Sequence, residues 1–255
     1  MNEYNKYDPE SGYEQTTVFT GRDDLHVANG VGDYVSSLSE ALTNEVVSKS
    51  FLFMFVALVI TAFAALTVDA ESAISVLTGG GIILLVAVEF AVVVSSNKAI
   101  ENNHAVLAAI LYTVYAYLNG YTLSIILALY TESSIAQVFV VSAVMFLVMA
   151  VFGLITKKDL TSFGSLLMMA LIGILIACFL NLLIFKSTGF DLILSIIFVL
   201  SFTGLTAYDT QKIKEHAAHA SDERVITLAL FSGFQLYLDF INLFIRLLRI
   251  LGKRK

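Results

Sequence analysis

Residues 225–247, VITLALFSGFQLYLDFINLFIRL, decide the fold of this chain. This apolar run is long enough to cross a bilayer, because a membrane helix takes about 20 residues. Its polar residues recur at steps of three and four, which places them on one helical face. They are Ser232, Gln235, Asp239, Asn242, Arg246 and Arg249. Since lipid would not solvate such a stripe, we expect the helix to lie deep in a bundle. The alternative is an interfacial helix whose stripe faces the headgroups.

Six further apolar runs precede this one, so the sequence predicts seven membrane helices. The chain is 58% hydrophobic and 14% charged, whereas soluble domains carry about 25% charged residues. Lipid cannot hydrogen-bond an open sheet edge, so the spans must be helices. We predict an all-α membrane domain over residues 46–255, preceded by an acidic, disordered cytoplasmic tail over residues 1–45. The predicted spans are 50–68, 74–95, 106–130, 135–156, 163–185, 190–209 and 225–247.

The basic residues predict a cytoplasmic N terminus. Lys and Arg concentrate in cytoplasmic loops, and here they occupy alternate loops, such as those holding Lys98 and Lys157. Seven spans would place Arg246 and the basic residues that follow it outside, which conflicts with this rule. Either the last segment re-enters the membrane and returns, or it spans. We favour spanning because of its length.

Two aspartates lie in the last two apolar runs. Asp209 ends one run in SFTGLTAYDTQKI, residues 201–213, and Asp239 lies inside the next. A carboxylate in a membrane segment is costly and marks a functional site by default. A helical hairpin that turns near residues 221–224 places both aspartates at the same level to within about one turn, at about 1.5 Å per residue. This spacing does not fix whether the two faces point at each other.

If the aspartates meet, their chemistry depends on pH. Two adjacent carboxylates in a low-dielectric site cannot both ionise easily, so they share a proton. Without that proton the pair repels itself and attracts a cation. Ca²⁺ takes about six to eight oxygen ligands, so Asp209 and Asp239 would form only a weak, transient metal site. The alternative is two independent, solvated carboxylates near the cytoplasmic interface.

Other charged residues are supporting candidates. Glu89 lies in the second predicted span and could pair with Lys98 or with Arg246, or lie at the interface. His216 and His219 stand beside acidic residues, but we expect this segment to be solvated and to bind no metal.

Three segments resemble the Bax inhibitor-1 family, also called the transmembrane Bax inhibitor motif family, in its bacterial branch. They are FTGLTAYDTQKIK at 202–214, LYLDFINLF at 236–244 and, more weakly, YLNGYTLSIIL at 117–127. The resemblance covers about residues 45–250 and implies seven transmembrane helices with the C-terminal helix central in the bundle. It also implies a pH-sensitive leak of Ca²⁺ in the bacterial plasma membrane, with Asp209 and Asp239 as the paired pH sensor. In the family a basic residue of the second helix contacts this pair. Here Lys98 is the nearest base, and lysine lacks the bidentate contact of arginine.

These observations favour a calcium leak channel gated by protonation of the aspartate pair. The alternative is a regulatory membrane protein of stress and cell survival that acts through membrane-protein partners and transports nothing itself. An intramembrane aspartyl protease is disfavoured, because Leu236-Tyr237-Leu238 precedes Asp239 where that class needs Gly-x-Gly and no proline follows Pro9. We therefore expect no enzymatic activity, no cofactor and no nucleic-acid partner. The expected partners are the bilayer, protons and calcium ions, and a monomer is favoured.

Overall fold

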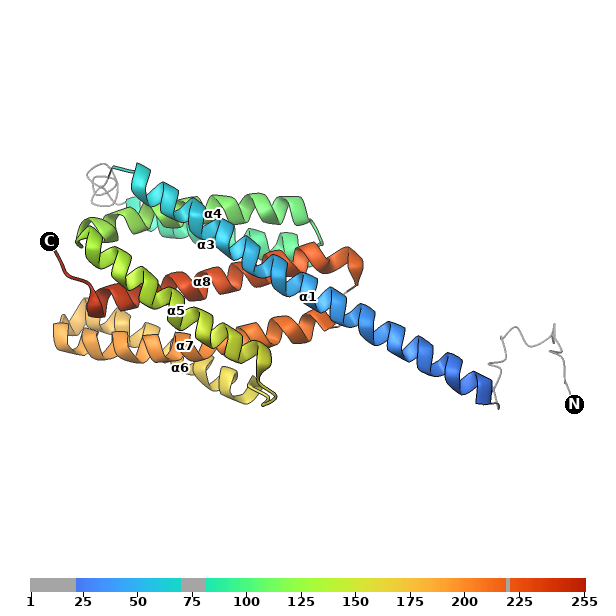
Figure 1. Cartoon of the computed structure of the whole chain (residues 1–255). Coiled ribbons are helices and arrows are strands. Elements are labelled where there is room, and N and C mark those ends of the chain that lie inside the picture. Colours follow the sequence, from blue (N-terminus) through green and yellow to red (C-terminus); the bar gives the residue numbers. More distant parts are fainter. Residues whose placement is uncertain (1–21, 70–80, 219–220) are drawn as a thin grey trace, which may run out of the picture. The chain divides into compact units, whose positions relative to one another are not determined.

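The computed structural model describes residues 22–69, 81–218 and 221–255, and these ranges are helical without any strand. A π-helical turn, Asn181–Phe185, precedes the helix α7 (Thr188–Ala218), and a 3-10 turn, Asp222–Arg224, follows it. The α-helices are α1 (Arg22–Thr67), α3 (Ile82–Glu101), α4 (Ala105–Ala128), α5 (Glu132–Ile155), α6 (Thr161–Leu180), α7 (Thr188–Ala218) and α8 (Val225–Leu251) (Figure 1).

The contacts between Cα atoms divide the chain into Met1–Leu38 and Ser39–Lys255. The helix α1 begins at Arg22, so residues 22–45 are helical where the sequence predicts a disordered tail. Two aspartates follow Arg22 directly, and acidic residues favour the first turn of a helix. Residues 1–21 lie outside the described ranges, and the domain boundary at residue 45 stays a prediction.

Six helical segments in the described ranges are long and apolar enough to cross a membrane. They are Ser37–Thr67, α4, α5, Thr161–Phe185, α7 and α8. The second predicted span, 74–95, corresponds in part to α3, which begins at Ile82 and carries Glu89, Lys98 and Glu101. Part of that predicted span falls in residues 70–80, outside the described ranges. The structure therefore confirms an all-helical membrane fold, while the number of seven spans stays a prediction.

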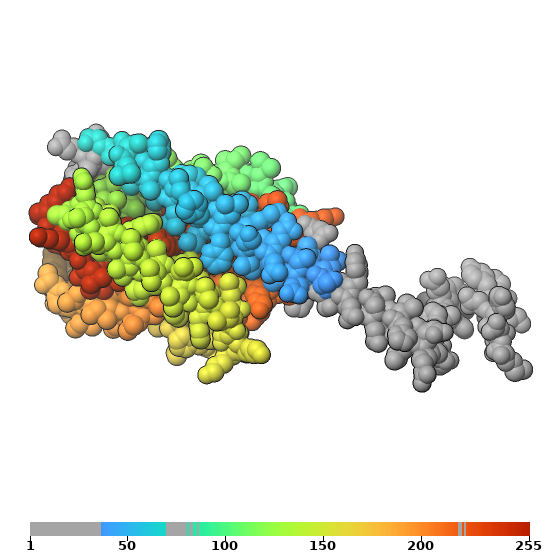
Figure 2. Space-filling model, viewed as in Figure 1, coloured from blue at the N-terminus to red at the C-terminus, as the bar shows by residue number. Residues whose placement is uncertain are grey.

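The helix α8 is the most buried of the six candidate spans. In the most apolar 18-residue stretch of α8, 67% of the residues are buried, whereas the corresponding share for Thr161–Phe185 is 11%. It contacts α3, α4, α5 and α7 and passes between the α3–α4 and α6–α7 pairs in Figure 1. In the face shown in Figure 2, α5 and the part of α1 that follows Leu38 cover much of the unit Ser39–Lys255. The alternative of an interfacial helix is wrong, because Ser232 and Asp239 of the polar stripe are buried inside the protein.

The helix α8 is also continuous. Its 27 residues, at about 1.5 Å per residue, are long enough to cross a bilayer without a break. One end of α8 lies at the α3–α4 loop, where the Thr227 hydroxyl donates to Oδ1 of Asn103 at 2.6 Å. At the other end the C-terminal residues pair with the α4–α5 loop, and the Thr131 N–H donates to the Lys253 carbonyl at 3.0 Å. The helix α8 therefore contains no break at which the segment turns back, and its crossing of the membrane stays a prediction.

Small residues let the helices approach closely. A Cβ atom added at Gly153 of α5 would collide with the backbone carbonyl of Ala207 in α7. A Cβ atom at Gly120 of α4 would collide with the carbonyl of Thr61 in α1. Close approach of this kind is how membrane helices associate, because lipid tails supply no hydrophobic drive between them.

Candidate aspartate-pair site

The structure brings the two aspartates together across the α7–α8 hairpin. The carboxyl groups of Asp209 and Asp239 lie within hydrogen-bonding reach of each other. Asp239 is only 5% exposed, and Asp209 is half-buried. The helices can align the two groups because α7 continues as a helix past Asp209 to Ala218, so both aspartates stand on rigid elements. The sequence spacing predicted their common level, and the structure adds that the two faces meet.

The remaining contacts of the polar stripe follow the same antiparallel register. The guanidinium of Arg246 lies 4.2 Å from the centre of the Phe198 ring in α7. One turn further along α8, Arg249 forms an ion pair with Asp191 in the first turn of α7. Residues later in α8 contact residues earlier in α7, as expected for antiparallel helices. The stripe therefore faces α7 along much of its length.

One oxygen of the pair has no hydrogen-bond partner. Oδ2 of Asp239 is buried, and no donor among the described residues reaches it. Two ionised carboxylates can only accept hydrogen bonds, whereas a protonated one also donates. Buried polar atoms in proteins are nearly always paired. A proton shared between the two acids supplies a donor that the surrounding side chains do not provide.

A cation that interacts with the pair belongs to α7 itself. Lys212 interacts electrostatically with Asp209, three residues earlier, and its Nζ lies 5.6 Å from the centre of the Tyr208 ring. The sequence analysis did not single out Lys212, although residues three apart on a helix are neighbours. Lys98, the nearest base to the second-helix position of the family's cation, is exposed near the C-terminal end of α3 and forms no ion pair with a described residue. The structure shows no contact of Lys98 with the aspartate pair among the described residues.

The predicted ion pairs of Glu89 are also absent from the described residues. The half-buried Glu89 accepts a hydrogen bond from the Thr122 hydroxyl of α4 at 3.0 Å. Its placement follows from the packing of α3 on α4. Arg246 instead lies at α6 and α7, where it donates to the Cys178 sulfur at 3.7 Å.

The other polar residues near the pair have structural contacts. Gln235 and Asn242 of the stripe are half-buried, and the Asn242 amide donates to the Leu238 carbonyl at 2.8 Å. Gln211, two residues after Asp209, accepts from the Leu160 N–H and donates to the Lys158 carbonyl, both at 2.8 Å. It thereby ties α7 to the loop between α5 and α6. The sequence analysis missed this residue, because nothing in the local pattern identifies its partners.

A hydrogen-bond network on another face of α8 was also missed. The Tyr237 hydroxyl lies 2.7 Å from the Thr61 hydroxyl, which donates to the Ala116 carbonyl at 2.9 Å. The Tyr112 hydroxyl donates to the Gly233 carbonyl at 3.1 Å. The network joins α1, α4 and α8 around a fully buried tyrosine. Its partners are far apart in the chain, so only the folded structure reveals it.

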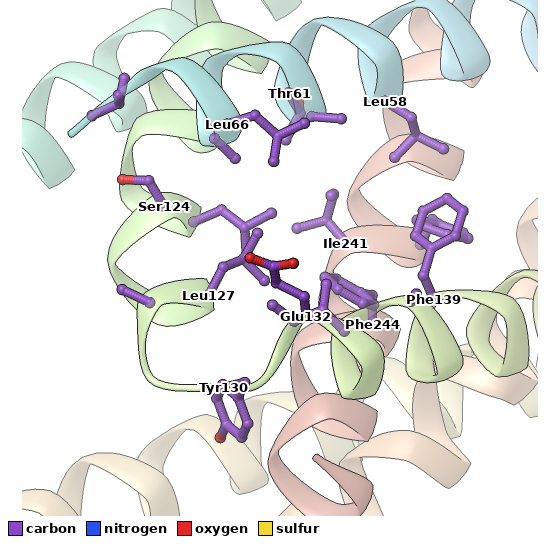
Figure 3. A pocket seen from close by; sticks show the side chains of 18 of the residues that line it. Leu58, Thr61, Leu66, Ser124, Leu127, Tyr130, Glu132, Phe139, Ile241 and Phe244 are labelled. Carbon is purple, nitrogen blue, oxygen red and sulfur yellow. The ribbon is translucent and has the colours of Figure 1, made fainter. Parts of the chain in front are cut away.

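Two pockets lie away from the aspartates. An apolar pocket of about 720 Å³ is lined by residues of α1, α4, α5 and α8, and the side chain of Glu132 lies among the apolar side chains that line it (Figure 3). A second pocket of about 990 Å³ lies between α6, α7 and α8. Neither pocket is lined by Asp209 or Asp239. Access to the pair through these pockets would therefore require the helices to move.

The described residues contain no group of three or more metal-binding side chains. The aspartate pair offers two carboxylates, fewer oxygens than Ca²⁺ prefers. His219 lies outside the described residues, so the predicted absence of a histidine site stays a prediction. The weak, transient Ca²⁺ site at Asp209 and Asp239 also stays a prediction.

Residues 43–255 match the family model described as inhibitor of apoptosis-promoting Bax1. The inner membrane protein YbhL of Escherichia coli K12 is 39% identical over 209 residues, which cover 80% of this chain and 89% of that protein. A protein of Borreliella burgdorferi is 37% identical over 219 residues, which cover 84% of this chain and 94% of its own length. A membrane protein of Streptococcus pyogenes serotype M3 is 40% identical over 162 residues, or 64% of this chain and 69% of that protein. With the six candidate spans, these relatives identify an integral membrane protein.

Proposed function

This chain belongs to the Bax inhibitor-1 family of membrane proteins, and from that membership and its aspartate pair we propose that it is a pH-sensitive calcium leak channel. The observation that carries the proposal is the contact between Asp209 and Asp239 across α7 and α8. Burying a carboxyl pair in which Oδ2 of Asp239 has no other partner is energetically costly. A costly group of this kind in a membrane segment favours a functional role. Proton-dependent gating is such a role.

The proposed gate is the proton that the two acids share. With the proton in place, a hydrogen bond joins α7 to α8 at this level. Without it, two like charges face each other in a low-dielectric site and repel. Lys212 interacts with Asp209 of its own helix, whereas the resemblance places the family's cation on the second helix. Loss of the proton therefore favours separation of the helices, and the leak should increase as pH rises.

Calcium enters the proposal as the transported ion. Two ionised carboxylates attract a divalent cation, yet they supply too few oxygens to hold it tightly. Weak binding suits a leak, because an ion that binds tightly leaves slowly. Asp209 and Asp239 would thus serve as both the pH sensor and a transient ion contact.

We also propose that α3 is a membrane helix and completes a bundle of seven, in which α8 is the central helix. The helix α3 has 20 residues and packs on both α4 and α8. Its Glu89 is half-buried and hydrogen-bonded to Thr122, which lowers the cost of placing a carboxylate at this depth. The contacts of α8 with helices on several sides support its central position.

A second candidate function is regulation of another membrane protein without transport. The description of the matching family names the inhibition of an apoptosis-promoting protein, Bax1. The absence of the aspartates from both described pockets is compatible with this alternative. It predicts no ion flux from the purified protein.

Reconstitution separates these two functions. The purified chain is placed in liposomes, and Ca²⁺ entry is measured from pH 5 to pH 8 against empty liposomes. A channel gives flux down the gradient without saturation or counterflow, whereas an exchanger shows both. Flux no greater than that of empty liposomes at any pH, from folded protein, would favour the regulatory function.

A further inference from the structure

The pocket between α6, α7 and α8, which we name the basic pocket, is rich in cations. Four basic side chains line its volume of about 990 Å³: Lys186, Arg246, Arg249 and Arg254. Asp191 is the one carboxylate among its lining residues. The basic pocket therefore carries an excess of positive charge, and an anion would balance it.

Arg246 has the largest unused capacity to bind an anion in the basic pocket. Its half-buried guanidinium contacts the Cys178 sulfur at 3.7 Å and the face of the Phe198 ring at 4.2 Å. It forms no ion pair with a described residue, whereas Arg249 is paired with Asp191. A guanidinium presents five N–H donors suited to carboxylate or phosphate. A sulfur atom and an aromatic ring leave most of these donors unused.

The basic pocket lies where three membrane segments end. The span Thr161–Phe185 ends beside it, α7 begins at Thr188, and α8 ends at Leu251. We expect these ends to lie at the depth of the lipid headgroups, because a membrane helix of about 20 residues spans the hydrocarbon core. Its apolar wall includes Leu175, Phe179 and Leu182, which are 51%, 61% and 71% exposed. Cations at headgroup depth beside an exposed apolar wall match the two parts of a phospholipid.

We propose that the basic pocket binds an anionic glycerophospholipid. Its phosphate would contact Arg246 together with the neighbouring cations, and an acyl chain would lie along the exposed face of α6. Clustered Lys and Arg side chains at the ends of membrane helices attract anionic lipid headgroups. Free inorganic phosphate shares the same chemistry, but the apolar wall favours the lipid. The proposal does not depend on whether the protein conducts calcium.

The chain contains no tryptophan, which permits a direct test. A single tryptophan is introduced by Phe179→Trp, beside the basic pocket, in the full chain. The protein is reconstituted in phosphatidylcholine vesicles that contain brominated phosphatidylglycerol or, at the same fraction, brominated phosphatidylcholine. Bromine quenches the fluorescence only of nearby tryptophan, so the two quenching curves compare local binding of the two lipids.

Phe63→Trp is the matched control reporter. Phe63 is also exposed, at 63%, and Leu66 of the same helix shares a pocket with the C-terminal Lys255. It therefore reports on lipid at the same end of the bundle but away from the basic pocket. The charge requirement is tested by adding Arg246→Gln and Arg254→Gln to Phe179→Trp, with Lys157→Gln as a charge control on the loop after α5.

We expect brominated phosphatidylglycerol to quench the reporter at position 179 at least threefold more effectively than brominated phosphatidylcholine. The ratio of quenching by brominated phosphatidylglycerol to quenching by brominated phosphatidylcholine should fall toward one when Arg246→Gln and Arg254→Gln are added. The ratio should stay high with Lys157→Gln, and it should be close to one for the reporter at position 63. Equal quenching by both lipids at position 179, or a preference that survives loss of both arginines, would overturn the proposal. Thermal stabilisation by inorganic phosphate that needs both arginines, without lipid preference, would assign the pocket to free phosphate and also reject the lipid.

Discussion

At the scale of single residues, the aspartate pair differs from the tyrosine network of α8 in lacking a complete set of hydrogen-bond partners. Among the described residues, Thr131 also has a buried side-chain oxygen without a partner, but its hydroxyl does not titrate. The Tyr237, Thr61 and Ala116 groups satisfy one another in a chain of hydrogen bonds. Asp239 retains an unpaired oxygen. This contrast separates a network that stabilises the fold from a pair whose protonation state can change.

The Tyr237–Thr61 hydrogen bond gives a first prediction. Tyr237→Phe and Thr61→Val should each lower the melting temperature in detergent, and together they should be less damaging than the sum of the two effects. Hydrogen bonds between membrane helices contribute about 0.6 kcal/mol on average and up to about 1.7 kcal/mol in such cycles. A coupling energy of zero in this double-mutant cycle would show that the contact contributes nothing.

The sequence predicted part of the site at this scale. Asp209 and Asp239 stand out because a carboxylate is rare in an apolar run, and the hairpin spacing fixes their common level. Lys212 could have been found from its spacing of three residues. The partners of Glu89 and Tyr237 could not, because Thr122 and Thr61 are ordinary helix residues that only helix packing brings near.

At the scale of helices, close contacts at glycine determine how near the helices lie. Gly153→Ala should destabilise the protein, because the new methyl group meets the Ala207 carbonyl of α7. Overpacking of this kind costs about 1–3 kcal/mol. Gly173→Ala is the matched control, since a Cβ atom there meets nothing within 4 Å. A melting temperature for Gly153→Ala equal to that of Gly173→Ala would contradict the close α5–α7 packing.

The start of α6 gives a pH-dependent prediction. Hydrogen bonds from the side chain and backbone of Thr161 lower the pKa of Asp159 in the loop before α6. A lowered pKa means that the ionised form stabilises the fold above the ordinary Asp pKa of about 3.9, and that this stabilisation disappears as pH falls through the folded-state pKa.

Asp159→Ala should therefore melt slightly below the parent at pH 7, and this difference should shrink as pH falls below about 4. Thermal melting of both proteins in detergent across this range measures the effect. Asp159→Asn keeps an oxygen acceptor and serves as the control. A difference between Asp159→Ala and the parent that stayed constant down to pH 3 would exclude a contribution from ionisation.

The sequence predicted where the helices lie along the chain more accurately than it predicted the residues at which they begin and end. The run between Gln211 and Ala220 lacks Gly and Pro, which predicted that the helix continues past Asp209, and α7 does continue to Ala218. The early start of α1 at Arg22 was not predicted, because a polar, charged composition resembles that of disordered segments.

At the scale of the whole molecule, orientation in the membrane stays a prediction that labelling can test. Ser187 and Ser221 are exposed, in the loops before α7 and before α8. With Cys178→Ser as background, Ser187→Cys should react with an impermeant maleimide in intact cells, and Ser221→Cys should react only after the membrane is opened. The reverse pattern would place the N terminus outside.

The central claim is that the proton shared by Asp209 and Asp239 gates calcium flux. The most direct measurement compares Ca²⁺ entry into liposomes from pH 5 to pH 8 for the parent, Asp239→Asn and the exposed control Asp159→Asn. An amide at position 239 donates a hydrogen bond to Asp209 at every pH, as the protonated acid does. We predict flux that rises with pH in the parent and in Asp159→Asn, and low flux that does not change with pH in Asp239→Asn. A parent-like pH profile in Asp239→Asn would contradict gating by this pair.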